Sequence, residues 1–183
     1  MNEENEEIFR QLKRALKTLK EDLNPEMIPA SGMTIAFAKN NAVINGEVAG
    51  VPDRITASKG KVIIPDDIMF SADTEISSAI LTAMKYDGAI RSAATIKYSE
   101  KNTEIIREYF PEVRSFDPER LPPVAASVDW GIAACCKEGD VPDVIFNRES
   151  TLREGRILVL GEDPVEIVRN IINLQRRINN KNQ

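Results

Sequence analysis

The sequence predicts a single α/β or α+β domain with a mixed sheet, and three observations support this fold class. The 183 residues suffice for one domain of ordinary size and are too few for two independent cores. Short β-like runs alternate with stretches of helical period from residue 33 onward. A predicted β-hairpin over residues 54–64 adds an antiparallel pair, so we expect a sheet that is not wholly parallel.

The first segment, residues 1–24, is predicted to form an amphipathic helix. Apolar residues recur three or four positions apart from Ile8 to Leu23, and glutamates precede the lysines and arginines, as the helix dipole favours. Asn24 and Pro25 end the helix. The narrow leucine stripe fits a dimer seam or a helix lying on its own domain. In either case we expect it to pack, because so few turns do not sustain an independent coiled coil.

The middle of the chain is predicted to contain short strands, a hairpin and two helices. The turn-prone residues 58–61 separate two β-like runs, which is the pattern of a hairpin. Asp87 and Gly88 close the first of the two helices. In chain order the predicted elements are a strand at 33–38, the hairpin strands at 54–56 and 62–64, a helix at 76–84, a strand at 94–98, a helix at 102–109 and a strand at 113–116.

The next part of the chain is predicted to contain a helix and two strands. Ser127 is a candidate N-cap for a helix over residues 130–137, and Gly139 ends that helix. The strands are expected at 144–146 and 156–160, with a polar loop between them.

The start of the last helix has the clearest local signal in the chain. Asp163 is the expected N-cap, Pro164 occupies the first helical position and Glu166 is the reciprocal capping residue. Apolar residues at helical spacing follow. The tail, residues 179–183, is expected to fray.

The composition excludes several kinds of site. The chain has no histidine, so a catalytic triad, a histidine-ligated zinc or haem and a histidine pH switch are all ruled out. The only cysteines are the neighbours Cys135 and Cys136, which are too few for a structural zinc site and indicate a reducing compartment.

The charge balance and hydropathy predict a cytoplasmic protein. The net charge of −5 provides no overall field that would attract nucleic acid or anionic lipid. No apolar stretch is long enough for a membrane span, and the acidic N-terminus is unlike a signal peptide. We therefore expect no direct nucleic acid binding and no membrane association.

Standard catalytic motifs are absent from the sequence. It has no phosphate-binding P-loop, no glycine-rich dinucleotide fingerprint, no C-x-x-C pair and no nucleophile elbow, so no nucleotide cofactor is expected. Two segments are compatible with phosphate binding. Arg54 follows a tight turn, and its guanidinium can bind a phosphate through two hydrogen bonds, although by itself Arg54 also fits a surface arginine. Residues 71–75 lead into a helix whose free N–H groups suit an anion, whereas Glu75 in that turn fits a carboxylate that compensates the dipole.

Other candidate residues have equally ordinary explanations. Lys85 fits a C-terminal helix charge, and Asp87 fits part of the following turn. Trp130, the only tryptophan, is more often a core anchor than a stacking platform. Asp143 precedes a strand and is either a ligand group or a turn residue. These residues alone predict no specific function.

A set of uncommon strings in a fixed order points to a family. AGVPDRI is followed by FSADTEISSAILTAMKYDGAIRSAATIKYS, SFD, DWG, GDVPDVIFN and RILVLGEDPVEIV. Together these strings resemble the ThiN-type thiamine-phosphate synthase domain over roughly residues 28–175. We assign residues 25–178 to this domain.

The resemblance implies a fold and a reaction. The fold is a three-layer αβα sandwich with a mixed sheet, similar to class II aldolases, often as a homodimer or as the C-terminal part of a fusion with a hydroxymethylpyrimidine kinase. In the reaction, the nitrogen of hydroxyethylthiazole phosphate displaces pyrophosphate from hydroxymethylpyrimidine diphosphate to give thiamine phosphate. Mg²⁺ commonly assists with such diphosphates.

Carried over by position, the resemblance marks two residues for activity. The family arginine corresponds to Arg54, and the family histidine at the start of the next helix corresponds to Glu75. A neutral imidazole there can donate a hydrogen bond to phosphate, whereas a carboxylate only accepts and repels an anion. Two unit charges about 4 Å apart interact by about 4 kcal/mol at an effective dielectric constant near 20, so Glu75 is expected to need a bridging cation.

The loop over residues 147–155 is a second departure from the family pattern. The family tends to carry a glycine-rich segment here, whereas this chain has Arg148 and Arg153, which can replace backbone N–H groups as phosphate ligands. Asn147, at the start of the loop, is a further candidate for substrate binding.

Two functions are therefore open. In the first, the chain is a thiamine-phosphate synthase in which Arg54, Lys85 and Arg148 or Arg153 hold phosphates and Glu75 acts through Mg²⁺. In the second, it is a non-catalytic domain that binds thiamine phosphate, as in sensor domains that resemble this family. A zinc aldolase is excluded because its site requires several histidines.

Overall fold

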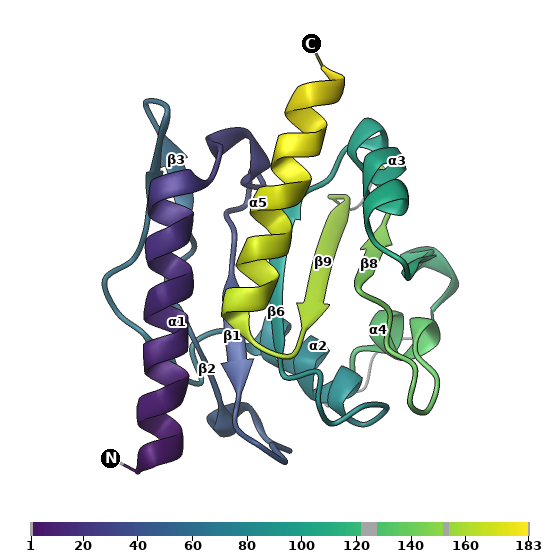
Figure 1. Ribbon diagram of the computed structural model, residues 1–183. Coiled ribbons are helices and arrows are strands. Elements are labelled where there is room, and N and C mark those ends of the chain that lie inside the picture. Colours follow the sequence, from purple (N-terminus) through teal and green to yellow (C-terminus); the bar gives the residue numbers. More distant parts are fainter. Residues whose placement is uncertain (1, 122–127, 152–153, 183) are drawn as a thin grey trace.

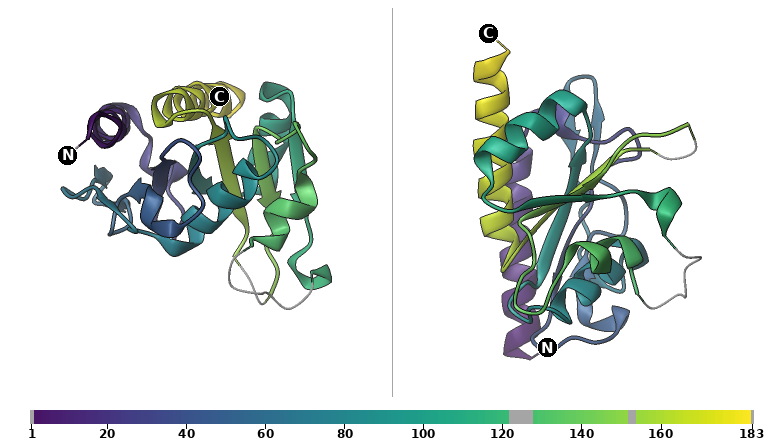
Figure 2. Two further views of the ribbon diagram at one scale, coloured as in Figure 1. Left: turned by 90° about the horizontal axis from the view of Figure 1, so that it is seen from below. Right: turned by 90° about the vertical axis from the view of Figure 1, so that its right-hand side faces the viewer.

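The computed structural model describes residues 2–121, 128–151 and 154–182, and it has a seven-stranded sheet between two layers of helices (Figures 1 and 2). The spatial order is β5-β2-β1-β6-β9-β8-β7, and every neighbouring pair is antiparallel except the parallel pair β7–β8. The strands span Ile35–Ala38 (β1), Val48–Gly50 (β2), Met69–Phe70 (β5), Ser92–Lys97 (β6), Val113–Phe116 (β7), Val144–Asn147 (β8) and Arg156–Gly161 (β9). The predicted mixed sheet and three-layer architecture are confirmed.

One face of the sheet is covered by α1 (Glu3–Asp22), α3 (Glu100–Tyr109) and α5 (Pro164–Lys181), as Figure 2 shows. The apolar stripe of α1 packs inside the domain, where Leu12 and Leu19 are fully buried, so it does not form a dimer seam. No helix in the part of the chain that the structure describes is long and apolar enough to cross a membrane.

A polar contact fastens α1 to α5. The buried amide of Gln175 donates from Nε2 to the Asp22 carbonyl (2.8 Å) and accepts at Oε1 from the Asn24 backbone N–H (2.6 Å). Gln175 therefore satisfies two backbone groups at the end of α1 that have no partner within that helix. The last helix runs to Lys181, so residues 179–181, which were expected to fray, are helical.

The opposite face is covered by two shorter helices, α2 (Thr74–Met84) and α4 (Trp130–Cys135). Because side chains alternate along a strand, Phe37 of β1 points toward the long helices, while Ala36 and Ala38 point toward α2. The core on this side is built mainly from alanine, isoleucine, leucine and cysteine side chains.

The starts of α4 and α5 test the N-cap residues that the sequence predicted. Asp163 caps α5 and Pro164 is its first residue, as predicted. The cap of α4 was predicted wrongly: Asp129 accepts from the Ile132 N–H (3.2 Å), because it directly precedes the first helical residue, while Ser127 lies outside the described residues. The helix ends at Cys135 rather than at residue 137, because Cys136 has an extended backbone.

The predicted hairpin is confirmed but is separate from the main sheet. Its strands are β3 (Thr56–Ser58) and β4 (Lys61–Ile63), and together they form their own two-stranded sheet. Lys59 and Gly60 both have positive φ angles (52° and 74°), as the two-residue turn of a hairpin requires. The main sheet is therefore mixed because of its own strand pairs and not because of this hairpin. Three short 3₁₀ turns complete the described elements, at Pro25–Met27 (η1), Asn45–Glu47 (η2) and Pro118–Arg120 (η3).

Candidate functional site

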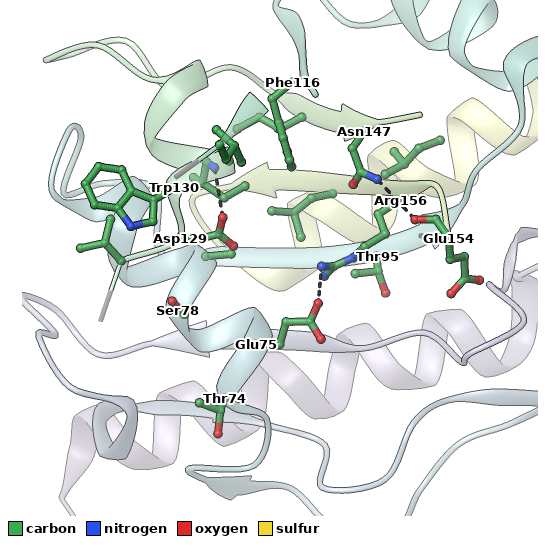
Figure 3. A pocket seen from close by; sticks show the side chains of 18 residues that line it. Thr74, Glu75, Ser78, Thr95, Phe116, Asp129, Trp130, Asn147, Glu154 and Arg156 are labelled. Atoms are coloured by element: carbon green, nitrogen blue, oxygen red, sulfur yellow. Dashed lines mark hydrogen bonds and ion pairs between the residues drawn. The ribbon is translucent and has the colours of Figure 1, made fainter. Parts of the chain in front are cut away.

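A cavity of about 610 Å³ lies on the face of the sheet that α2 and α4 cover (Figure 3). Its floor comes from side chains that alternate onto this face of three neighbouring strands: β6, β8 and β9. The walls come from the first turns of α2 and α4 and from the end of β7. The described lining residues with polar or aromatic side chains are Thr74, Glu75, Ser78, Thr95, Phe116, Asp129, Trp130, Asn147, Glu154 and Arg156.

Two arginines converge on Glu75 at the start of α2. Arg156 of β9 forms an ion pair with Glu75 Oε1, and Arg54 Nη2 lies 3.7 Å from Glu75 Oε2. Arg54 also lies 3.3 Å from Oδ2 of Asp73, the N-cap residue of α2. Guanidinium groups bind carboxylate and phosphate oxygens in the same way. The position of the Glu75 carboxylate is therefore a point at which two cations can hold an anion.

The other end of the cavity is formed by the start of α4. The Asp129 backbone N–H donates to Thr82 Oγ1 of α2 (3.0 Å), which ties the two helices together. Trp130 is 39% exposed, so the expectation that it anchors the core was wrong. As the first residue of a one-and-a-half-turn helix it points outward, while Ile132 and Cys135 face the core.

Arg54 and Glu75 are the predicted residues that the structure brings together. Lys85 and Asp87 lie beyond the other end of α2, whose eleven residues span about 16 Å, and neither lines the cavity. Asp87 instead accepts from the Ala89 N–H (3.0 Å) in the turn that was the alternative explanation for it.

The predicted residues around β8 are dispersed. Asn147 is buried at the end of β8 and lines the cavity, and its Nδ2 donates to the carbonyls of Arg148 (3.4 Å) and Glu154 (3.3 Å). Arg148 contributes instead to a separate small cavity beside α3. Arg153 lies outside the described residues.

Asp143 lies at the opposite end of β8 from Asn147 and has a structural role. Its Oδ2 accepts from the Glu112 backbone N–H (3.1 Å), which joins the starts of β7 and β8. Burial raises the pKa of the Asp143 carboxyl above its usual range. The turn explanation of Asp143 is therefore the one that the geometry supports.

The sequence did not single out Arg156, Thr95 or Asp129, which it offered only within the longer strings that resemble the family. Arg156 and Leu158 share one face of β9 by strand alternation, so their common orientation was readable. Which face carries a cavity depends on helices far away in sequence, and no local pattern reports it.

The described residues provide no group of three or more acidic or cysteine side chains that could hold a metal ion. The two cysteines are buried, and burial raises the pKa of both thiols to about 11. They are therefore protonated at neutral pH and are poor nucleophiles.

Comparison with known proteins identifies the family. The model of the thiamine-phosphate synthase ThiN family matches residues 11–173, which is most of the chain. The chain belongs to the ThiN family. It is a thiamine-phosphate synthase-like domain.

Two curated ThiN relatives are similar in sequence. The bifunctional thiamine biosynthesis protein ThiDN of Methanocaldococcus jannaschii is 34% identical over 176 residues, which cover 95% of this chain and 42% of that protein. The thiamine-phosphate synthase ThiN of Methanothermobacter thermautotrophicus is 28% identical over 157 residues, which cover 82% of this chain and 83% of that protein. The chain therefore spans less than half the length of the ThiDN protein.

Two solved structures share the fold of this chain. The C-terminal domain of protein MJ0236 superposes with a TM-score of 0.90 at 33% identity, covering 100% of this chain and 99% of that one. A sugar-phosphate aldolase from Thermotoga maritima has a TM-score of 0.54 at 9% identity, covering 96% and 93% of the two chains. At so low an identity the aldolase likeness concerns the fold alone, and it confirms the predicted architecture.

Proposed function

We propose that this chain makes thiamine phosphate, with Arg54 and Arg156 holding phosphate oxygens at the start of α2. The observation that carries the proposal is the convergence of both guanidinium groups on one point at the cavity. The N-terminal N–H groups of α2 and its dipole favour an anion at the same place.

The proposed reaction is a single displacement at carbon. The thiazole nitrogen donates its lone pair to the methylene carbon of hydroxymethylpyrimidine diphosphate, and a C–N bond forms. The C–O bond to the diphosphate breaks, and its electron pair leaves with the pyrophosphate. The nitrogen thereby acquires a positive charge. Arg54 and Arg156 stabilise the negative charge that accumulates on the leaving group.

Glu75 must give up its place for a phosphate to bind there. Its side chain is 52% exposed, so it can turn toward solvent without leaving a buried charge unpaired. Exposed ion pairs contribute about 0–1 kcal/mol, so exchanging the carboxylate for a more highly charged phosphate is favourable at both arginines. A carboxylate at this position therefore lowers phosphate affinity without abolishing the site.

The chain offers few ligands for Mg²⁺. Mg²⁺ bound with a diphosphate needs only one or two carboxylates, and Asp73 and Glu75 are the nearest to the arginines, although both are paired with Arg54. When bound, the ion would supply positive charge to the leaving group. The steps above use only residues of the chain.

The decisive experiment is to incubate the protein with both substrates and Mg²⁺ and to measure thiamine phosphate by mass spectrometry. We expect product from the wild type and more product from Glu75→His, because an imidazole leaves both arginines free. Glu138→Gln is the control, since Glu138 is exposed and does not line the cavity. Absence of product from both the wild type and Glu75→His would overturn the proposal.

The second candidate function is non-catalytic binding of thiamine phosphate. The observation that favours it is that Glu75 occupies the point between the two arginines. It predicts product from Glu75→His and none from the wild type, together with calorimetric binding of thiamine phosphate by the wild type.

A further inference from the structure

We propose that the end of the cavity formed by Asp129, Trp130 and Phe116 binds an aromatic ring that carries a positive charge. This inference deepens the proposed function and rests on it for the identity of the ring, because it names the charge that the same cavity favours.

The charges lining the cavity are unbalanced. Among the lining residues that the structure describes, Arg156 is the only cation, whereas Glu75, Asp129 and Glu154 are acidic. Arg156 is paired with Glu75. Neither Asp129 nor Glu154 forms an ion pair with any described residue. Two negative charges therefore remain, and Figure 3 shows them at opposite ends of the cavity.

The Asp129 carboxylate is held in place by its own backbone and by α4. One oxygen, Oδ1, accepts from the Ile132 N–H (3.2 Å), and the Asp129 N–H is anchored to Thr82. The second oxygen has no hydrogen bond within the described part of the chain, and the side chain lines the cavity. A fixed carboxylate in a partly enclosed cavity attracts a cation more strongly than an exposed one does.

Two aromatic side chains line the same cavity as this carboxylate. Trp130 is the largest partly exposed apolar side chain lining the cavity, and Phe116 packs directly on α4. The packing is possible because residue 131 is glycine: a Cβ there would lie 2.4 Å from Cζ of the Phe116 ring. Aromatic faces attract cations, and tryptophan does so most strongly.

The proposed reaction changes the charge that this end of the cavity meets. The thiazole ring is neutral in the substrate and becomes a thiazolium cation when the C–N bond forms. A carboxylate and two aromatic rings therefore bind the product ring more tightly than the substrate ring. The same contacts stabilise the positive charge as it develops in the transition state.

The test compares thiamine, which has the cationic ring but no phosphate, with 3-deazathiamine, a neutral analogue that keeps the pyrimidine and has carbon in place of the charged ring nitrogen. Trp130 is the only tryptophan, so its fluorescence reports on this end of the cavity, and calorimetry gives the affinities. A cation–aromatic contact of about 1.4 kcal/mol corresponds to about tenfold, so we expect thiamine to bind about tenfold more tightly. Equal affinities would overturn the inference, as would no detectable binding of thiamine at millimolar concentration.

Asp129→Asn separates the charge from the fold. Asparagine caps a helix as well as aspartate does, so the variant retains the cap of α4 and loses only the negative charge. We expect it to weaken thiamine binding about fivefold to tenfold and to leave the binding of 3-deazathiamine unchanged, on the scale of a removed charge contact. Asp163→Asn, at the N-cap of α5 away from the cavity, is the matched control. An equal loss in both variants, or none in Asp129→Asn, would contradict the inference.

The outcome is independent of the synthase assay. Thiamine carries no phosphate and Arg54 does not line the cavity, so Arg54→Ala is expected to abolish product formation while changing thiamine affinity less than about twofold. The two ion pairs that the variant loses, with Asp73 and Glu75, lie at the start of α2. If the wild type makes no thiamine phosphate but still binds thiamine more tightly than the neutral analogue, the proposed reaction is refuted and the cationic subsite is supported. If the wild type makes thiamine phosphate but binds thiamine and the neutral analogue equally well, the proposed reaction is supported and the cationic subsite is refuted.

Discussion

The two faces of the sheet differ in the helices that cover them. On one face α1 and α5, of 20 and 18 residues, pack with α3 over a core of large aliphatic and aromatic side chains. On the other, α2 and α4 have 11 and 6 residues, and part of the sheet between them is left open as the cavity. The face under α1, α3 and α5, the closed face, contributes the larger apolar core. The face under α2 and α4, the open face, contributes the polar side chains that line the cavity.

Both faces use the same strands. In β9, the Val159 side chain belongs to the core beneath the long helices, whereas Arg156 and Leu158 line the cavity. Because side chains alternate along a strand, the packed side holds the cavity side in place. Changes on the closed face should therefore alter stability, and changes on the open face should alter ligand binding and turnover.

The largest effect is expected from Leu19→Ala on the closed face. Leu19 lies on the buried face of α1 and is fully buried, so truncating it should reduce the free energy of unfolding by about 2–5 kcal/mol. Urea denaturation measures this change. Lys20→Ala, one residue away and exposed, should change stability by less than about 0.5 kcal/mol. Thiamine phosphate synthesis per folded molecule should be unchanged. A loss of turnover in the folded fraction would contradict the assignment of stability to the closed face and of turnover to the open face.

Arg156→Ala on the open face should lower turnover and leave stability almost unchanged. Removing one of two cations that hold the leaving group should lower kcat/KM about 100-fold, or about 2.7 kcal/mol of transition-state stabilisation. Because its ion pair is partly exposed, stability should change by no more than about 1 kcal/mol. Arg169→Ala, an exposed arginine on α5, serves as the control in steady-state kinetics and in urea denaturation. A stability loss as large as that of Leu19→Ala would show that the cavity is part of the main core.

Gly131→Ala tests the boundary between the faces. The added methyl group would displace the Phe116 ring, and overpacking of this kind costs about 1–3 kcal/mol. Since Phe116 lines the cavity, thiamine affinity should fall as well. Gly88→Ala is the matched control, because a Cβ there meets no atom within 4 Å. Thermal denaturation and calorimetry distinguish the two variants, and equal behaviour would contradict the packing described for α4.

The smallest effect is expected in the separate hairpin. Gly60 has a φ angle of 74°, so Gly60→Ala should cost about 1–2 kcal/mol and leave turnover unchanged. Asparagine tolerates this conformation better, so Gly60→Asn should cost less. Thermal denaturation of both variants checks this order. A larger loss of stability for Gly60→Asn than for Gly60→Ala would show that the positive φ angle is not the cause.

The sequence predicted the elements better than the site. Asp163 and Pro164 located the start of α5, and turn residues located the hairpin, because these signals act within a few residues. The site depends on which helix covers which face. Lys85 and Glu75 were both assigned to the phosphate site of the synthase hypothesis, yet they lie at opposite ends of α2 and only Glu75 lines the cavity. Asp129 and Arg156 meet at one cavity from positions 27 residues apart in sequence, which no local pattern reports.

The contact of Gln175 with the end of α1 has a consequence for how the protein is made. Asp22 and Asn24 find this partner about 150 residues later in the chain. During synthesis α1 emerges before α5 and cannot complete its docking until α5 has left the ribosome, and contacts so distant in sequence slow folding. Until then the leucine stripe of α1 lacks the part of its partner surface that α5 provides, and exposed apolar surface of this kind favours aggregation.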